Sequence, residues 1–204
     1  MWQNEFWNRG VRRVYGLDGA TLPGGMPQEN VSARRSTGLI VDEAGRPIDA
    51  DYILTDIRTP VLGRRVAGDR AHLLALYRVR QPVRLAQRIT GWYDDNWTGP
   101  QVTWTREQCS GGRLRLDLRS DPGLFKGTVQ HVVISGATPA KTVVVHPNDE
   151  AHVLTLPLRP SSGTCSVDLR ISPARIPSNY PQLHIQDSRL LGVHVDYFTY
   201  LQPR

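Results

Sequence analysis

The segment 91–100 concentrates side chains that suit sugar recognition. It contains three aromatic rings, two carboxylates and one amide between two glycines. Aromatic rings stack on the apolar C–H faces of a sugar, and carboxylate or amide oxygens accept bonds from its hydroxyls or bind a calcium ion. We therefore expect a carbohydrate site here, with Asp94 and Asp95 as ligands if calcium binds. Its candidate residues are Trp92, Tyr93, Asp94, Asp95, Asn96 and Trp97.

The same segment also has a purely structural interpretation. Asp-Asp-Asn followed by Thr-Gly-Pro is ordinary turn chemistry, and Trp92 and Trp97 could instead fill the end of a hydrophobic core. A hydrolytic role for Asp94 and Asp95 has less support. Adjacent carboxylates cannot, from sequence alone, be given the separation of roughly 5 to 10 Å that glycoside hydrolysis uses.

A second candidate pair, Asp187 and Arg189, precedes the last expected strand. The two side chains could simply pair with each other at the surface, which is the commoner outcome, or they could line a ligand site. In a Greek-key arrangement the final strand returns beside an early strand, so this turn can lie near segment 91–100. We include both residues among the carbohydrate-binding candidates.

Patterns of established catalytic and metal sites are missing from the sequence. There is no Gly-x-Ser-x-Gly, no Gly-x-Gly-x-x-Gly, no phosphate-binding loop and no His-Glu-x-x-His. The histidines occur singly and without ligand spacing, so we interpret each as a surface or cross-strand residue. They are His72, His131, His146, His152, His184 and His194.

The composition is typical of a turn-rich globular protein. Of 204 residues, 39% are hydrophobic and 22% are charged, with 18 Gly and 15 Pro. The formal net charge is +6, yet the arginines are scattered: Arg113 and Arg115 alternate with Leu114 and Leu116, as on the wet face of a sheet. Nucleic-acid binding is not expected, because it would need basic residues gathered in one run or on one face.

Neither a membrane span nor a signal peptide is recognisable. No stretch approaches the roughly 18 to 20 apolar residues that a span requires. The first residues lack the basic and apolar regions of a signal peptide. Because Trp2, Phe6 and Trp7 follow the start so abruptly, we interpret the chain as a fragment of a longer protein.

Periodicity divides the chain into three expected regions. Residues 1–36 predict an amphipathic helix over 2–17 and an extended connector, and residues 37–70 predict a small hairpin subdomain. Residues 71–204 predict a mostly β domain, an antiparallel, jelly-roll-like β-sandwich. The expected strands are 73–79, 83–89, 102–105, 114–118, 129–134, 142–145, 153–158, 167–171 and 192–201.

The two cysteines, Cys109 and Cys165, each lie beside a Gly/Ser-rich turn and an alternating strand. So placed, they could form one disulfide, which would imply an oxidising compartment. Neither belongs to a Cys-x-x-Cys or Cys/His cluster, so zinc and redox sites have little support. Two independent buried thiols are the alternative.

Short motifs along the chain carry a resemblance. They are Leu76-Tyr77-Arg78-Val79, Pro82-Val83-Arg84-Leu85, Gly91-Trp92-Tyr93, Trp97-Thr98-Gly99, Cys109 with Gly112, Ser120-Asp121-Pro122, Cys165, Asp187-Ser188-Arg189-Leu190-Leu191-Gly192-Val193 and Phe198-Thr199-Tyr200. This series, which covers most of the chain, resembles the extracytoplasmic C-terminal domain of actinobacterial multi-pass membrane glycosyltransferases. Relatives such as the mycobacterial arabinosyltransferases end in a jelly-roll carbohydrate-binding module.

The resemblance implies a non-catalytic role. Those enzymes use lipid-phosphate-linked sugar donors, and their catalytic carboxylates lie in the membrane part, which this chain lacks. The chain would then lie on the extracytoplasmic face of the membrane, with a cell-envelope glycan and the transmembrane catalytic part as its partners, and Cys109 and Cys165 would be joined. The alternatives are a structural or protein-interaction sandwich without glycan binding and, with less support, a stand-alone glycan hydrolase.

Overall fold

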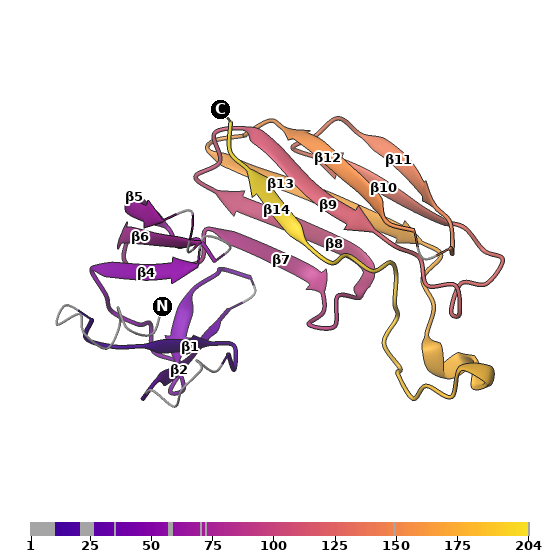
Figure 1. Cartoon of the computed structure of the whole chain (residues 1–204), viewed down its shortest axis with the longest axis horizontal. Helices are drawn as coiled ribbons and strands as arrows, with labels where there is room; N and C mark the ends of the chain where they lie inside the picture. Colours follow the sequence, from indigo (N-terminus) through magenta and orange to yellow (C-terminus); the bar gives the residue numbers. More distant parts are fainter. Residues whose placement is uncertain are drawn as a thin grey trace. The chain divides into compact units, whose positions relative to one another are not determined.

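The computed structural model describes residues 11–20, 27–34, 36–56, 59–69, 71, 73–148 and 150–203 (Figure 1). Strands predominate in this part of the chain. The elements are β1 (Tyr15–Leu17), β2 (Glu29–Ala33), β3 (Ile40–Asp42), β4 (Tyr52–Asp56), β5 (Gly63–Asp69), β6 (Leu74–Val79), β7 (Gln87–Trp92), β8 (Thr98–Glu107), β9 (Gly112–Leu118), β10 (Gln130–Gly136), β11 (Lys141–Val145), β12 (His152–Leu158), β13 (Thr164–Ser172), the 3-10 helices η1 (Pro177–Asn179) and η2 (Pro181–Leu183), and β14 (Phe198–Leu201).

The chain forms two compact units, Met1–Arg88 and Ile89–Arg204. The first unit contains two three-stranded sheets, ordered β1-β2-β3 and β4-β6-β5. Strands β1 and β2 pair in parallel, and the other pairs are antiparallel. A small apolar core fills this unit, made of Val31, Ile40, Ile48, Val61 and Val83.

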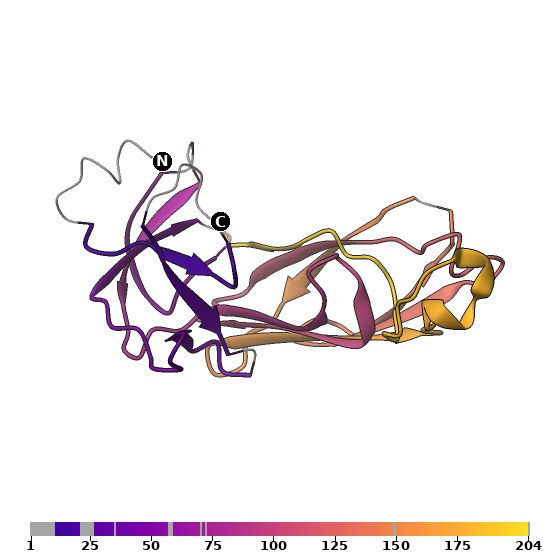
Figure 2. The same cartoon turned by 90° about the horizontal axis from the view of Figure 1, so that it is seen from below.

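The second unit is a β-sandwich. A five-stranded sheet, β11-β10-β13-β8-β7, and a three-stranded sheet, β12-β9-β14, form its two layers (Figure 2). Alternation along β9 directs Leu114 and Leu116 into the core while Arg113 and Arg115 are exposed, as the sequence predicts. Trp104 of β8 is fully buried in the same core. The expected antiparallel β-sandwich is confirmed.

Residues 191–195 connect the two sheets at one end of the sandwich. The Gly192 N–H donates to the Thr98 carbonyl oxygen at 2.7 Å, and the Thr98 N–H donates to the Val193 carbonyl oxygen at 2.9 Å. His194 exchanges two backbone bonds with Arg119, at 2.9 and 3.0 Å. Because Thr98 begins β8 and Arg119 follows β9, this segment bonds to both layers.

Gly192 is required by this close approach. A Cβ atom there would lie 2.7 Å from the Thr98 hydroxyl oxygen and 2.8 Å from the Gly99 carbonyl oxygen. A larger residue would therefore push the crossing segment away from β8.

Cys109 and Cys165 form a disulfide, which confirms the expected pairing. Both residues are buried and belong to the sandwich core. Disulfides form and persist in oxidising compartments, so this bond indicates such an environment. Among the residues that the structure describes, there is no helix with the length and apolar character that crossing a membrane requires.

The expected N-terminal helix is not found in the described part of its range. Residues 2–10 lie outside the described residues, and Tyr15–Leu17 form strand β1 beside β2. The expected connector also contains a strand, Glu29–Ala33, whose Val31 is buried in the small core. A short apolar run is compatible with both the helix period and the strand period. Pairing with β2, rather than the local pattern, therefore makes Tyr15–Leu17 a strand.

The expected hairpin within 37–70 is wrong in its pairing. Strand β3 pairs with β2, whereas β4 pairs with β6. The turn after β3 closes on itself, since the Asp42 N–H donates to the Arg46 carbonyl oxygen at 2.8 Å. Pairs β2–β3 and β4–β6 cross the boundaries expected at 36/37 and 70/71, and the first unit ends at Arg88.

We predict that replacing both Cys109 and Cys165 by alanine lowers the free energy of unfolding of the second unit by about 2 to 4 kcal/mol, because the loop they close regains freedom when unfolded. Guanidinium unfolding of the double variant and of the wild type, with and without reductant, measures this. The wild type in reductant should approach the variant. Equal midpoints for the oxidised wild type and the variant would contradict the prediction.

Candidate functional site

Residues 93–97 form a tight turn between β7 and β8. The Tyr93 N–H donates to the Trp97 carbonyl oxygen at 2.8 Å, and the Asn96 N–H donates to the Tyr93 carbonyl oxygen at 3.0 Å. Asn96 has a φ of 66°, in the left-handed region that asparagine adopts more readily than most residues. The turn therefore presents Asp94 and Asp95, both exposed, at its tip.

Arg189 joins this turn to the segment before the last strand. Its Nη1 and Nη2 donate to the two carboxylate oxygens of Asp95, at 3.2 and 2.6 Å. Its Nε donates to both carboxylate oxygens of Asp187 at 3.0 Å, and Nη2 also reaches Asp187 at 2.6 Å. The sequence prediction that residues 187–189 can lie near segment 91–100 is therefore met in the fold.

The same guanidinium covers an aromatic ring. The Cζ atom of Arg189 lies 4.8 Å from the ring centroid of Tyr93. Planar guanidinium groups are attracted to aromatic faces in this arrangement. One face of the Tyr93 ring is thus covered by Arg189. The Tyr93 side chain also packs on a separate apolar cluster of the second unit, made of Leu124, Phe125 and Leu191.

The charges of the network hold both carboxylates ionised. Hydrogen bonding to Arg189 lowers the pKa of Asp95 and of Asp187 below their usual values. In turn, hydrogen bonds to Asp187 and then to Asp95 raise the pKa of Arg189. The side chains of Arg189 and Asp95 are 38% and 48% exposed, so the network is open to solvent and to a ligand.

Trp92 is not brought into this cluster. Its indole Nε1 donates to the Val195 carbonyl oxygen at 2.9 Å, and its ring meets Phe198 edge-on with centroids 5.5 Å apart. Trp92 packs against the main sandwich core. Its placement follows the structural interpretation, in which this ring closes the end of the core.

Trp97 lies beside the cluster and is partly buried. Its ring centroid is 3.9 Å from that of His194, with the planes inclined by 45°. Trp97 also packs on the cluster of Leu124, Phe125 and Leu191 that supports Tyr93. Burial lowers the pKa of His194 below 6.5, although nearby carboxylates, Asp121 first, oppose the shift. His194 is therefore a neutral ring at neutral pH.

Two residues that pack beside Phe125, Arg175 and Tyr180, were not anticipated from the sequence. Arg175 donates to the Leu124 carbonyl oxygen at 2.7 Å and to the Thr128 hydroxyl at 2.9 Å. Its Cζ atom also lies 5.2 Å from the ring centroid of Tyr180. The only sequence signal was an aromatic residue between the prolines of segment 177–181, which has no periodicity to place it.

Metal binding and proton transfer find little support in this arrangement. Among the described residues, no group of three or more His, Cys, Asp or Glu side chains is arranged to hold a metal ion. A carboxyl with a lowered pKa, such as that of Asp95, is also a poor proton donor near neutral pH.

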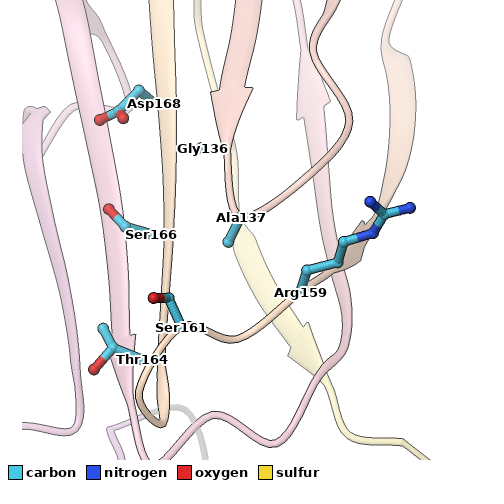
Figure 3. A pocket seen from close by; sticks show the side chains of 7 residues that line it. All are labelled: Gly136, Ala137, Arg159, Ser161, Thr164, Ser166 and Asp168. Atoms are coloured by element: carbon cyan, nitrogen blue, oxygen red, sulfur yellow. The ribbon is translucent and has the colours of Figure 1, made fainter.

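A shallow concavity lies elsewhere on the second unit (Figure 3). It has a volume of about 320 Å³ and follows Thr164, Ser166 and Asp168 of β13 and the loop at Ser161. Figure 3 shows the Arg159 guanidinium directed away from this row. No aromatic ring lines the concavity, so it lacks the stacking surface that the turn 93–97 offers.

Comparison with known proteins gives no family. No protein-family model matches the chain, and no curated protein matches it. A mutant of a family 29 carbohydrate-binding module, solved in complex with mannohexaose, is 12% identical and covers 75% of this chain and 92% of its own, with a TM-score of 0.30. A likeness of that extent assigns neither a fold nor a ligand to this chain.

We predict that Arg189→Ala raises the pKa of Asp95 toward its usual value of 3.8. Because the folded-state pKa is lowered, the ion pair contributes stability above pH 3.8 and loses it as the pH falls further. Carboxyl-carbon NMR titration measures the shift. Arg170→Ala, which removes an exposed arginine of β13, should leave the pKa of Asp95 unchanged. If the pKa of Asp95 is the same in Arg189→Ala as in the wild type, the network is contradicted.

Proposed function

We propose that this chain is a non-catalytic, sugar-recognising domain that binds glycan at the turn 93–97 together with residues 187–189. The observation that carries the proposal is the placement of Arg189, which fixes Asp95 and Asp187 while it lies over Tyr93. Aromatic rings, carboxylates and a guanidinium thus converge from distant parts of the chain on one exposed surface. Such a surface matches the mixed apolar and hydroxyl character of a sugar.

The Arg189 network suits recognition better than stability. Ion pairs between exposed side chains contribute only about 0 to 1 kcal/mol to folding. Each ionised carboxylate has roughly four lone-pair sites, so Asp95 and Asp187 can accept bonds from sugar hydroxyls while they remain bonded to Arg189. Because the groups are ordered before the ligand arrives, less conformational freedom is lost on binding.

The local charge favours neutral sugars. Two carboxylates, those of Asp95 and Asp187, bond to the guanidinium of Arg189, and the exposed Asp94 adjoins Asp95 in the turn. The surface therefore carries excess negative charge, which repels uronic acids and phosphorylated sugars. Neutral arabinan or mannan fragments are the ligand class that we propose.

The aromatic contribution is modest. Tyr93 and Trp97 each have one face in contact with a protein group, Arg189 and His194 respectively. Ring contacts contribute about 1 kcal/mol each beyond burial, so we expect dissociation constants on the order of micromolar to millimolar. Weak binding is sufficient for a module that raises the effective concentration of a tethered glycan.

The proposed setting is the extracytoplasmic face of a cell membrane. The motif series resembles the C-terminal domains of membrane glycosyltransferases that use lipid-phosphate-linked donors, and the buried disulfide is consistent with an oxidising location. In this setting the sandwich is a jelly-roll-like module that positions the growing cell-envelope glycan for a transmembrane catalytic part. The low pKa of Asp95 and Asp187 supports binding rather than acid–base chemistry.

Calorimetric titration of the full chain with neutral arabinan and mannan oligosaccharides tests the proposal. We expect the wild type to bind one of them and Asp95→Asn to bind about tenfold more weakly, because a bond to a charged acceptor contributes roughly 1.5 to 3 kcal/mol. Trp97→Ala should weaken binding by a smaller factor.

The matched control for this titration is Asp51→Asn. It removes an exposed carboxylate from the first unit and should bind like the wild type. The proposal fails if the wild type binds no neutral oligosaccharide, or if folded Asp95→Asn binds with undiminished affinity.

A further inference from the structure

The sheet β4-β6-β5 of the first unit has one face on the core of that unit and one outer face. Ile53 of β4 and Tyr77 of β6 pack on the core. Side chains alternate along a strand, so the neighbouring Tyr52 and Arg78 point to the outer face. Figure 1 shows β6 between β4 and β5, which places Arg78 on the middle strand of this face.

Two arginines lie directly opposite each other on the outer face. Arg78 of β6 pairs in register with Arg64 of β5, and both residues are exposed. Directly opposite residues have Cβ atoms about 4.5 to 5.5 Å apart, and like charges in such a pair repel. Among the residues that the structure describes, no carboxylate forms an ion pair with either arginine. The arginine pair therefore carries two positive charges that a bound anion would neutralise.

The acidic residues on the same face lie too far along the strands to neutralise this pair. Asp56 and Asp69 oppose Leu74 of β6, which lies four residues before Arg78. A strand rises about 3.3 Å per residue, so the two rows are about 13 Å apart. This separation exceeds the Debye length of about 8 Å at physiological ionic strength. Both aspartates also have interaction partners within the chain.

Exposed aromatic and apolar surface adjoins the arginine pair. Tyr52 of β4 lies in register beside Arg78 and is 55% exposed. Leu54, the next residue of β4 on the same face, is 47% exposed. Aromatic rings stack on the C–H faces of sugars. The face thus combines a cationic pair with a ring against which the body of a ligand can pack.

We propose that Arg64 and Arg78 bind the phosphate monoester of a sugar phosphate whose ring contacts Tyr52. A phosphate monoester carries a charge of about −1.5 to −2 at pH 7 and offers three strong acceptor oxygens. Two guanidinium groups match that charge, and each presents a fork that fits phosphate oxygens in bidentate fashion. A carboxylate carries a single charge, which one arginine neutralises.

This site goes beyond the proposed glycan surface and is independent of it. Arg64, Arg78 and Tyr52 belong to the first unit, whereas the turn 93–97 belongs to the second. The two surfaces also select different ligands, because the excess negative charge at the turn repels phosphorylated sugars. Asp95→Asn should therefore bind a sugar phosphate as the wild type does.

Amide NMR titration of the full chain with glucose 1-phosphate tests the phosphate site. We expect shift changes at Tyr52, Arg64 and Arg78 and a dissociation constant on the order of millimolar or below. Arg64→Gln combined with Arg78→Gln should weaken binding at least tenfold, because charge-assisted hydrogen bonds to the phosphate are lost. Tyr52→Ala should weaken binding about threefold, because it removes only the ring contact.

The matched control is Arg113→Gln combined with Arg115→Gln. It removes the same charge from exposed positions of β9 in the second unit and should bind like the wild type. Glucose should leave the three amides unchanged, and glucuronate should bind at least fivefold more weakly than glucose 1-phosphate.

Three results would overturn the proposal. The first is a wild type that does not bind glucose 1-phosphate, including one that binds vesicles of phosphatidic acid instead. The second is undiminished affinity in folded Arg64→Gln/Arg78→Gln. The third is equal affinity for glucuronate and glucose 1-phosphate, which would show that the pair does not select phosphate.

Discussion

The candidate site depends on the bonds that residues 191–195 make to both sheets of the sandwich. Buried Thr98 is central to this crossing: its backbone bonds to Gly192 and Val193, and its hydroxyl accepts from the Val193 N–H at 2.9 Å. Unpaired polar groups cost roughly 1 to 3 kcal/mol when buried, so the crossing segment has a strongly preferred register on β8. This register brings the segment before it, with Arg189, beside the turn that precedes β8.

The exposed network is a consequence of that scaffold. The contact of Arg189 with Asp95 is exposed and its contact with Asp187 is partly buried, and exposed ion pairs contribute little to folding. The buried backbone bonds of the crossing segment set the positions of their main chains. The residues of the side-chain network are not part of the main sandwich core.

Sequence patterns predicted the parts of the fold that follow from local alternation. Leu114 and Leu116 face inward and Arg113 faces outward, as a strand period requires. Pairing between distant strands was not readable in the same way: β4 joins β6 although β3 is its nearer neighbour in the chain. Short strands carry too few side chains to specify a partner, and tertiary packing decides.

The candidate site was predictable in its residue types and only partly in its geometry. Tyr93, Asp95 and Arg189 converge as a Greek-key return allows. Trp92 turned toward the core because its indole N–H reaches Val195, a contact that no spacing rule contains. His194, the ring partner of Trp97, lies within the expected strand 192–201, whereas Leu124 and Phe125 come from a segment in which no strand was expected.

Amide NMR spectra of the chain during titration with a neutral oligosaccharide test the central claim most directly. Our account predicts that the largest changes in amide chemical shift fall at residues 93–97 and 187–189. The amides of Thr164, Ser166 and Asp168 in β13 should be unaffected. Changes confined to the concavity along Thr164, Ser166 and Asp168, or no changes within the second unit, would contradict it.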